Sequence, residues 1–323
     1  MNDAFLAGPL RVRIETCEPS VRDKIAETLA LYDRPWDGPF LDIVLDARSV
    51  DRGAVMVDGA YLRCARMTVD ADGGEFHATT RCGARARSSG AARRRWSIEV
   101  PAAAVASDQL EELEDLVGLA LTTGWRAAGW VALHAAAVVR DGICPIFCAG
   151  SGGGKSTLTA ALVRSGWRAL GDDKLLLRYA EGGAELRALL RTFNLHPRTR
   201  EWFPEVGDLT LLPAYSAWTE KRKFRIDRTW PETSAPHARP THVVRVNRGG
   251  NSRRIAVGEL ARADIFPTLL RQIAIPGDRE TAATILATVA KTVGGLRGLD
   301  IVVGDDAYCD EDCLAELERA LAP

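Results

Sequence analysis

One glycine-rich segment combines residue types that bind phosphate. Residues 149–157 read A-G-S-G-G-G-K-S-T, which is the phosphate-loop pattern with alanine in place of the first glycine. Glycines let successive backbone N–H groups turn toward one anion, and the positive end of the following helix adds to the attraction. We expect Lys155, on an exposed loop, to reach the β- and γ-phosphates of ATP, and the Ser156 hydroxyl to bind magnesium. The expected phosphate contacts are Gly150, Ser151, Gly152, Gly153, Gly154, Lys155, Ser156 and Thr157.

Acidic residues and a histidine flank this segment. Asp172 and Asp173 lie 17 and 18 residues after Lys155, and His134 lies 21 residues before it. One carboxylate can bind near magnesium while its neighbour accepts the proton of an acceptor hydroxyl. The sequence does not show which aspartate does which, and we expect Ser156 and Asp173 at the metal. His134 is either a core residue or a neutral imidazole, its pKa lowered by burial, that contacts phosphate or orients an aspartate.

A basic stretch, TEKRKFRID, is a second candidate for contact with phosphate. Strand alternation would place Lys221, Lys223 and Arg225 on one face. Fixed cations stabilise the negative charge that moves during phosphoryl transfer, so these three form a candidate clamp, the alternative being a solvated basic strand. Arg191 is a similar candidate. Glu185 is either a further metal ligand or a solvated strand end.

The elements around these residues indicate an α/β nucleotide domain. An apolar strand at 143–148 runs into the glycine-rich segment, and a helix with an apolar face follows it. Strands are also expected within 130–139, 167–173 and 174–179, with an extended, Pro-rich stretch at 229–240. Toward the end of the chain we expect strands at 241–247 and 299–303, and helices at 259–274, at 278–292 and from Glu311.

Residues 130–178 resemble the HPr serine kinase/phosphorylase family. They repeat its order of histidine, strand, turn, strand, phosphate loop, helix, turn and paired aspartates, with the same spacing. The resemblance implies a P-loop kinase domain with a mixed sheet and flanking helices, in which Lys155 and Ser156 match the phosphate and magnesium positions. It also implies that Asp172 and Asp173 match the family's acidic pair and His134 its site histidine. The chain looks most like the HPr-kinase-related proteins of bacterial biosynthetic clusters, such as lasso-peptide kinases.

Two departures from the family limit what the resemblance implies. Residues 185–204, ELRALLRTFNLHPRTREWFP, contain no equivalent of the Gly-rich, Glu-containing stretch that the family uses for its phosphorylase activity. Reverse phosphorolysis is therefore not expected. The first 115 residues do not look like the N-terminal domain of regulatory HPr kinases, which argues against HPr itself as the acceptor.

The sequence pattern of the N-terminal residues is typical of a smaller α+β domain. We expect this domain at 1–115 and the kinase domain at 116–323. Short alternating stretches predict strands at 10–15, 40–46 and 61–69. Helices are expected at 20–32, capped by Ser20, and at 107–129, beginning with a Ser-Asp cap signal.

Residues 81–95, RCGARARSSGAARRR, hold six arginines and no large apolar residue. We expect an exposed loop, which is either a solvated turn or a contact for an acidic peptide. On the second interpretation the N-terminal domain binds the acceptor.

Composition excludes some classes of partner. The chain has 42 basic and 43 acidic residues, so no net field attracts it to nucleic acid or to an acidic membrane. There is no apolar run of about 20 residues and no signal-peptide pattern at the start, so we expect a cytoplasmic protein. The seven scattered cysteines indicate reduced thiols, and Cys309 and Cys313 lack the nearby partners of a zinc site. A homo-oligomer stays possible.

Three functions fit these residues. The first is an ATP- and Mg²⁺-dependent kinase acting on a Ser/Thr hydroxyl of a peptide or protein. The second uses the same site on a small-molecule alcohol. The third is a nucleotide-binding switch or assembly protein with slow hydrolysis, which fits the paired aspartates less well because hydroxyl activation needs a carboxylate beside the phosphates.

Overall fold

A computed structural model gives the fold of the chain, and it divides into two compact units. Unit 1 is Met1–Val131 with Ile275–Ile285, and unit 2 is Ala132–Ala274 with Leu286–Pro323. The described residues are 4–32, 34–51, 62–63, 67–72, 75–89, 94–106, 112–150, 152–216, 219–250, 254–276 and 278–322. In these ranges no helix has the length and apolar character needed to cross a membrane.

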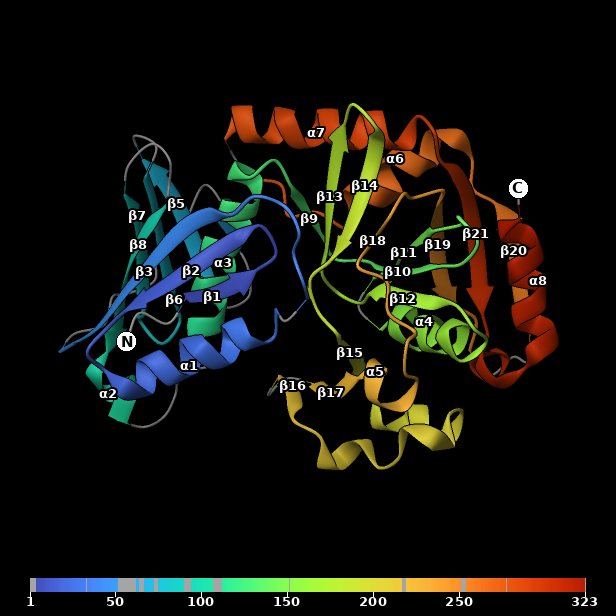
Figure 1. Ribbon diagram of the computed structural model, residues 1–323, viewed down its shortest axis with the longest axis horizontal. Coiled ribbons are helices and arrows are strands. Elements are labelled where there is room, and N and C mark those ends of the chain that lie inside the picture. Colours follow the sequence, from blue (N-terminus) through green and yellow to red (C-terminus); the bar gives the residue numbers. More distant parts are fainter. Residues whose placement is uncertain are drawn as a thin grey trace. The chain divides into compact units, whose positions relative to one another are not determined.

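Unit 1 contains an eight-stranded mixed sheet in the order β1-β2-β3-β8-β7-β6-β5-β4 (Figure 1). Strands β2, β3 and β8 run parallel, and the other neighbours are antiparallel. The strands are β1 (Ala4–Ala7), β2 (Leu10–Glu15), β3 (Leu41–Val50), β4 (Leu62–Arg63), β5 (Met67–Asp72), β6 (Glu75–Thr80), β7 (Arg85–Ser89) and β8 (Arg95–Pro101).

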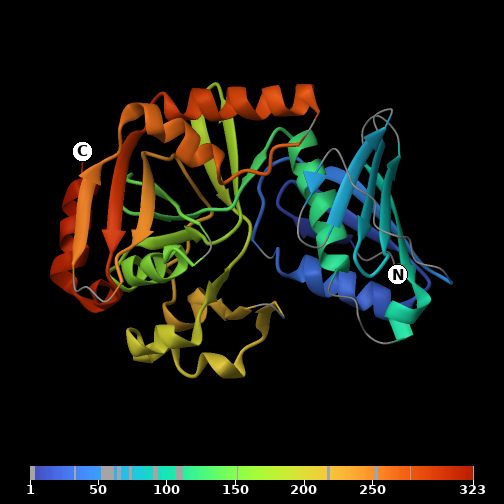
Figure 2. The same ribbon diagram turned by 180° about the vertical axis from the view of Figure 1, so that it is seen from behind.

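Helices cover this sheet on its apolar face. The helices are α1 (Pro19–Ala30), α2 (Ala102–Ala106) and α3 (Leu113–Ala127), and α1 and α3 pack on the sheet and on each other (Figure 2). Alternate strand residues such as Leu10 and Ile43 are buried beneath them. Gly124 permits the close approach of α3, because a Cβ there would collide with both of these side chains. The predicted helix at 20–32 is confirmed, but Ser20 is not its cap: Glu18 is the N-cap residue and makes no side-chain capping bond.

The predicted exposed loop at 81–95 is wrong where this stretch enters strands, while residues 81–84 do form a turn. Arg85 begins β7 and Arg95 begins β8, while residues 90–93 and the Ser-Asp cap signal at 107–108 lie outside the described residues. Buried Ala86 and Ser88 alternate with exposed Arg85 and Arg87. These small side chains face the core because α3 packs against β7, so the stretch needs no large apolar residue to form a strand.

Unit 2 is built on three sheets. The largest has the order β12-β10-β11-β19-β21-β20, and the others have the orders β18-β14-β13-β9 and β15-β17-β16. The strands are β9 (Val131–Leu133), β10 (Ala136–Val139), β11 (Pro145–Cys148), β12 (Arg168–Gly171), β13 (Leu175–Ala180), β14 (Gly183–Ala188), β15 (Thr192–Leu195), β16 (Ala214–Ser216), β17 (Thr219–Arg225), β18 (His237–Ala238), β19 (His242–Arg248), β20 (Ile255–Glu259) and β21 (Arg297–Val303).

The six-stranded sheet is mixed and has helices packed against it. Its strands β11, β19 and β21 are parallel, with antiparallel neighbours at both ends. The α-helices described after residue 150 are α4 (Lys155–Arg164), α5 (Ile226–Thr229), α6 (Arg262–Leu270), α7 (Arg279–Val293), whose first residues belong to unit 1, and α8 (Glu311–Leu321). Helices α4, α6 and α8 contact its strands. The prediction of an α/β chain with mixed sheets is confirmed.

His134 interrupts the strand that the sequence predicts within 130–139. The structure has two short strands there, β9 and β10, and they belong to different sheets. The His134 backbone N–H donates to the Gln272 carbonyl at 2.7 Å instead of to a neighbouring strand. His134 therefore lies in the short connection between a strand of the four-stranded sheet and a strand of the six-stranded sheet.

Candidate functional site

The segment between β11 and α4 has a backbone shape that requires glycine. Gly152 has φ 75° and Gly154 has φ 89°, left-handed conformations that are costly for other residues. A Cβ at Gly153 would lie 2.6 Å from the Ala149 Cβ. Ala149 does not have a positive φ, so alanine at the first position of the motif causes no strain. Ser151 lies outside the described residues.

The start of α4 fits a polyphosphate. Its N-cap residue is Gly154, which makes no side-chain capping bond. The first N–H groups of an α-helix have no acceptor within the helix, and the helix dipole makes this end positive. The glycine-rich turn and the helix start therefore offer a phosphate both hydrogen-bond donors and a favourable field.

Lys155 is buried rather than exposed as the sequence predicted, because its side chain folds back over the loop. The residue is 6% exposed, and Nζ donates to the Ala149 carbonyl at 2.9 Å. Burial lowers the pKa of Lys155, while the charges of Asp173 and Asp172 raise it. A phosphate at the loop would give this ammonium a stronger acceptor than a carbonyl.

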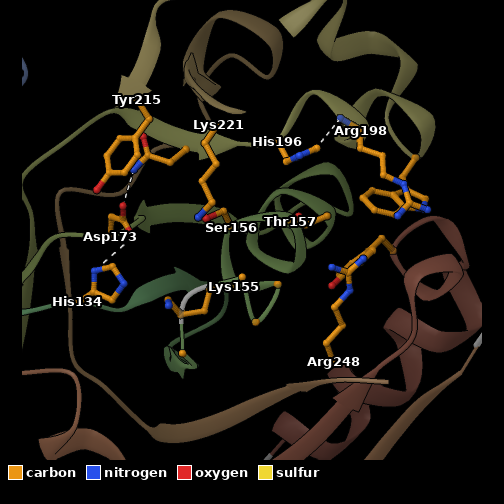
Figure 3. A pocket seen from close by; sticks show the side chains of 17 residues that line it. His134, Lys155, Ser156, Thr157, Asp173, His196, Arg198, Tyr215, Lys221 and Arg248 are labelled. Atoms are coloured by element: carbon orange, nitrogen blue, oxygen red, sulfur yellow. Dashed lines mark hydrogen bonds and ion pairs between the residues drawn. The ribbon is translucent and has the colours of Figure 1, made fainter. Parts of the chain in front are cut away.

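A cavity of about 410 Å³ opens around the loop, within unit 2 (Figure 3). This volume is in the range of small-molecule sites. Of the residues that the sequence predicted, it is lined by His134, Lys155, Ser156, Thr157, Asp173, Lys221 and the glycines Gly150, Gly152, Gly153 and Gly154. Residues from four separate parts of the sequence therefore face one space.

Asp172 is fully buried directly beneath the start of α4. The Ser156 hydroxyl donates to its Oδ1 at 3.0 Å, and the Asn194 backbone N–H donates to its Oδ2 at 3.1 Å. Burial, together with the neighbouring Asp173 charge, raises the pKa of Asp172, and the two hydrogen bonds oppose this. The carboxyl group is fixed against the hydroxyl that the sequence assigned to magnesium.

Asp173 faces the cavity, in contrast to Asp172. Its φ of 66° is left-handed, a conformation that aspartate tolerates better than most residues. The Asn194 side-chain amide donates to its Oδ2 at 2.5 Å, and His134 Nδ1 lies 3.5 Å from its Oδ1 (Figure 3). The sharp turn thus directs the two adjacent carboxylates to different surroundings, Asp172 to the buried Ser156 hydroxyl and Asp173 to the cavity.

His134 meets Asp173 from the edge of the cavity. Its side chain is 54% exposed. Desolvation lowers the pKa of His134, the Asp173 charge raises it, and the lysines nearby, Lys155 first, lower it further. The net shift of the His134 pKa is downward, which favours the neutral imidazole, and an Nδ1–H of this ring can donate to the Asp173 carboxylate.

The three cations of the predicted clamp are separated. Lys221 lines the cavity, but Lys223 and Arg225 do not. Arg225 donates two hydrogen bonds to Asp227, at 2.9 and 2.8 Å, and Arg191 lies 3.5 Å from the same carboxylate. The charges of Arg225 and Arg191 are thus neutralised outside the cavity.

Glu185 also lies apart from the site. In β14 it accepts hydrogen bonds from Arg178 at 2.8 Å and from Arg187 at 2.6 Å, and it does not line the cavity. These arginines lower the pKa of Glu185 against the effect of its partial burial.

Several lining residues were not predicted from the sequence. They are Asn194, His196, Arg198, Trp202, Tyr215, Arg248 and Tyr308. They come from β15, from the segment after it, from β16, from β19 and from the 3₁₀ helix at Asp305–Cys309. No spacing pattern marks them, and only Asn194 and His196 lie close in sequence to a residue chosen as a candidate, Arg191.

Two arginines of the arginine-rich stretch, Arg87 and Arg95, face carboxylates. Arg87 donates to Glu75 at 2.8 and 2.5 Å, and Arg95 lies 2.6 Å from Glu15 and 3.5 Å from Asp46. The charge of these two arginines is therefore compensated within the sheet.

Comparisons with known proteins give little to add to this geometry. No family model matches the sequence, and no curated protein matches it. The chain is weakly similar to the solved Hpr(Ser) kinase/phosphatase from Coxiella burnetii, with a TM-score of 0.32 and 8% identity over 59% of this chain and 96% of that one. The function proposed below rests on the site residues.

Proposed function

We propose that this chain is an ATP- and Mg²⁺-dependent P-loop kinase that phosphorylates a serine or threonine hydroxyl of a peptide or protein. One observation carries the proposal: buried Asp172 holds Ser156 at the start of α4 while the next residue, Asp173, faces the same cavity. A phosphate site with a carboxylate beside it has the two parts that transfer to a hydroxyl needs.

The metal side of the site is Ser156 with Asp172. Hard oxygen ligands suit Mg²⁺, which commonly takes one or two protein oxygens along with those of the substrate phosphates. Magnesium, when bound, supplies positive charge against the phosphate oxygens. The sequence favoured Asp173 at the metal, and the hydrogen bond from Ser156 to Asp172 favours Asp172 for this role.

The proton side of the site is Asp173. Its carboxylate takes the proton of the acceptor hydroxyl as the hydroxyl oxygen bonds to the terminal phosphorus and the bond from that phosphorus to the ADP oxygen breaks. Asn194 and His134 hold the carboxylate in position. Lys155 and Lys221, which both line the cavity, stabilise the charge that moves to ADP.

The acceptor is proposed to be a polymer because a large aromatic side chain stands exposed at the cavity. Tyr215 lines the cavity and is 37% exposed. A bound peptide that extends from the cavity would cover this side chain.

Mass spectrometry of the reaction products tests the proposal. The protein is incubated with ATP and Mg²⁺ together with a library of Ser/Thr peptides, or with a mixture of small alcohols. A mass gain of one phosphate on peptides supports the proposed acceptor, and a gain on small alcohols alone moves the activity to the second class. If ATP binds but neither acceptor accelerates ADP formation, the protein is a nucleotide-binding switch and the proposal fails.

A further inference from the structure

The cavity has a second end that the proposed chemistry does not use. Arg198, Trp202, Arg248 and Tyr308 line it there. In Figure 3 the labelled Arg198 and Arg248 lie on one side of Lys155, Ser156 and Thr157, and His134 and Asp173 lie on the other. Since the terminal phosphate must lie near Asp173, the rest of a nucleotide must extend toward the arginines.

Aromatic and cationic groups are assembled at this end. The Trp202 and Tyr308 rings lie 5.1 Å apart between centroids, and the Arg198 guanidinium lies 5.5 Å from the centroid of the Trp202 ring. Trp202 keeps part of its surface accessible, while Tyr308 is 3% exposed. A planar base can stack on an aromatic ring or on a guanidinium plane.

A buried carboxylate fixes the arginines. Asp305 is 4% exposed and accepts two hydrogen bonds from Arg248, at 2.9 and 2.7 Å, while Arg198 Nη1 lies 3.6 Å from its Oδ2. Tyr308 belongs to the same 3₁₀ helix, and its hydroxyl oxygen would collide with a Cβ added at Gly154. The 3₁₀ helix thus connects the arginines to the glycine-rich loop.

We propose that this end, with Arg198 and Trp202 as the stacking face and Asp305 and Arg248 as its support, is the subsite for the nucleoside of the triphosphate. The proposal rests on the function proposed above, because it takes the direction of the nucleotide from the position of Asp173. Recognition by stacking depends on the face of the base, so ATP and GTP should both bind here.

Equilibrium binding of two probes, measured by calorimetry with Mg²⁺, tests the subsite. ATP has a nucleoside, and inorganic tripolyphosphate has only the phosphates. Arg198→Gln and Trp202→Leu should each raise the Kd for ATP by about tenfold and change the Kd for tripolyphosphate by less than about twofold. Trp202→Phe should restore most of the ATP affinity. Arg140→Gln is the matched control, because Arg140 also lies over a tryptophan ring, that of Trp167, but outside the cavity.

Other results overturn the subsite. An equal rise in the Kd for ATP and for tripolyphosphate would show that this end of the cavity binds phosphate. An unchanged Kd for ATP in both variants would show that this end makes no contact with the nucleoside. Each of these results leaves the kinase proposal intact. The reverse result, the expected binding pattern without phosphorylation of any acceptor, would keep the subsite and remove the kinase proposal.

Discussion

The Ser156 hydroxyl and the Asp172 carboxylate form a buried hydrogen bond of 3.0 Å at the start of α4. This contact joins the glycine-rich segment to the aspartate pair, which follows it in the sequence after one helix and one strand. Because Asp172 is engaged in this way, the adjacent Asp173 is the aspartate that faces the cavity.

Lys155→Met should lower the rate of phosphoryl transfer by roughly 10²- to 10³-fold, because the variant lacks a fixed cation that stabilises the negative charge developing during transfer. The change should alter the free energy of unfolding by less than about 1 kcal/mol, since burial already disfavours the lysine charge. Steady-state kinetics and urea denaturation measure the two effects. Near-normal turnover in a folded variant would remove Lys155 from the reaction.

Asp172→Asn should change how stability depends on pH. Because the pKa of Asp172 is raised in the folded protein, its contribution to stability is complete when it is protonated and is lost as the pH rises above the usual carboxyl pKa of about 4. Asparagine can still accept from the Asn194 N–H and can donate to Ser156, and it carries no charge. The variant should therefore gain stability over the wild type as the pH rises.

Urea denaturation at about pH 5 and about pH 8, without Mg²⁺, measures this gain. The difference in the free energy of unfolding should be larger at the higher pH. An equal difference at both values would show that Asp172 does not titrate with a raised pKa.

Gly154→Ala should destabilise the fold by about 1 kcal/mol or more, because its φ is 89° and the new Cβ would collide with Tyr308 Oη. Gly150→Ala is the matched control, since Gly150 has no positive φ and no atom within 4 Å of an added Cβ. Thermal unfolding of both variants gives the comparison. Equal melting temperatures would mean that the loop is free to rearrange.

Arg95→Gln should change the acceptor KM by less than about twofold, because Glu15 and Asp46 already compensate the Arg95 charge and exposed ion pairs contribute little. The sequence left two interpretations of the arginine-rich stretch, a solvated turn or a contact for an acidic acceptor. Acceptor kinetics at low salt measure the effect. A large rise in the acceptor KM with an unchanged KM for ATP would show that unit 1 contacts the acceptor.

Local sequence patterns were enough to predict those site residues that lie within or near the glycine-rich motif in the sequence. The glycine-rich motif predicted the turn and α4, and the paired aspartates with His134 were chosen by their spacing from it. Asn194 and Tyr308 could not be found in this way, because common residue types from distant segments carry no periodic signal. The arginine stretch was misassigned because buried Ala86 and Ser88 reveal a strand only once α3 is seen to pack close to them.

Transfer of labelled terminal phosphate from ATP to Ser/Thr peptides by wild type, Asp173→Asn and Asp172→Asn tests the central claim most directly. We expect Asp173→Asn to lower kcat by about 10²-fold or more with ATP binding retained. Asp172→Asn should lower it by a similar factor at low Mg²⁺ and recover in part as Mg²⁺ is raised. Unimpaired transfer by Asp173→Asn to the acceptor that the wild type phosphorylates would contradict the role of this carboxylate as the proton acceptor.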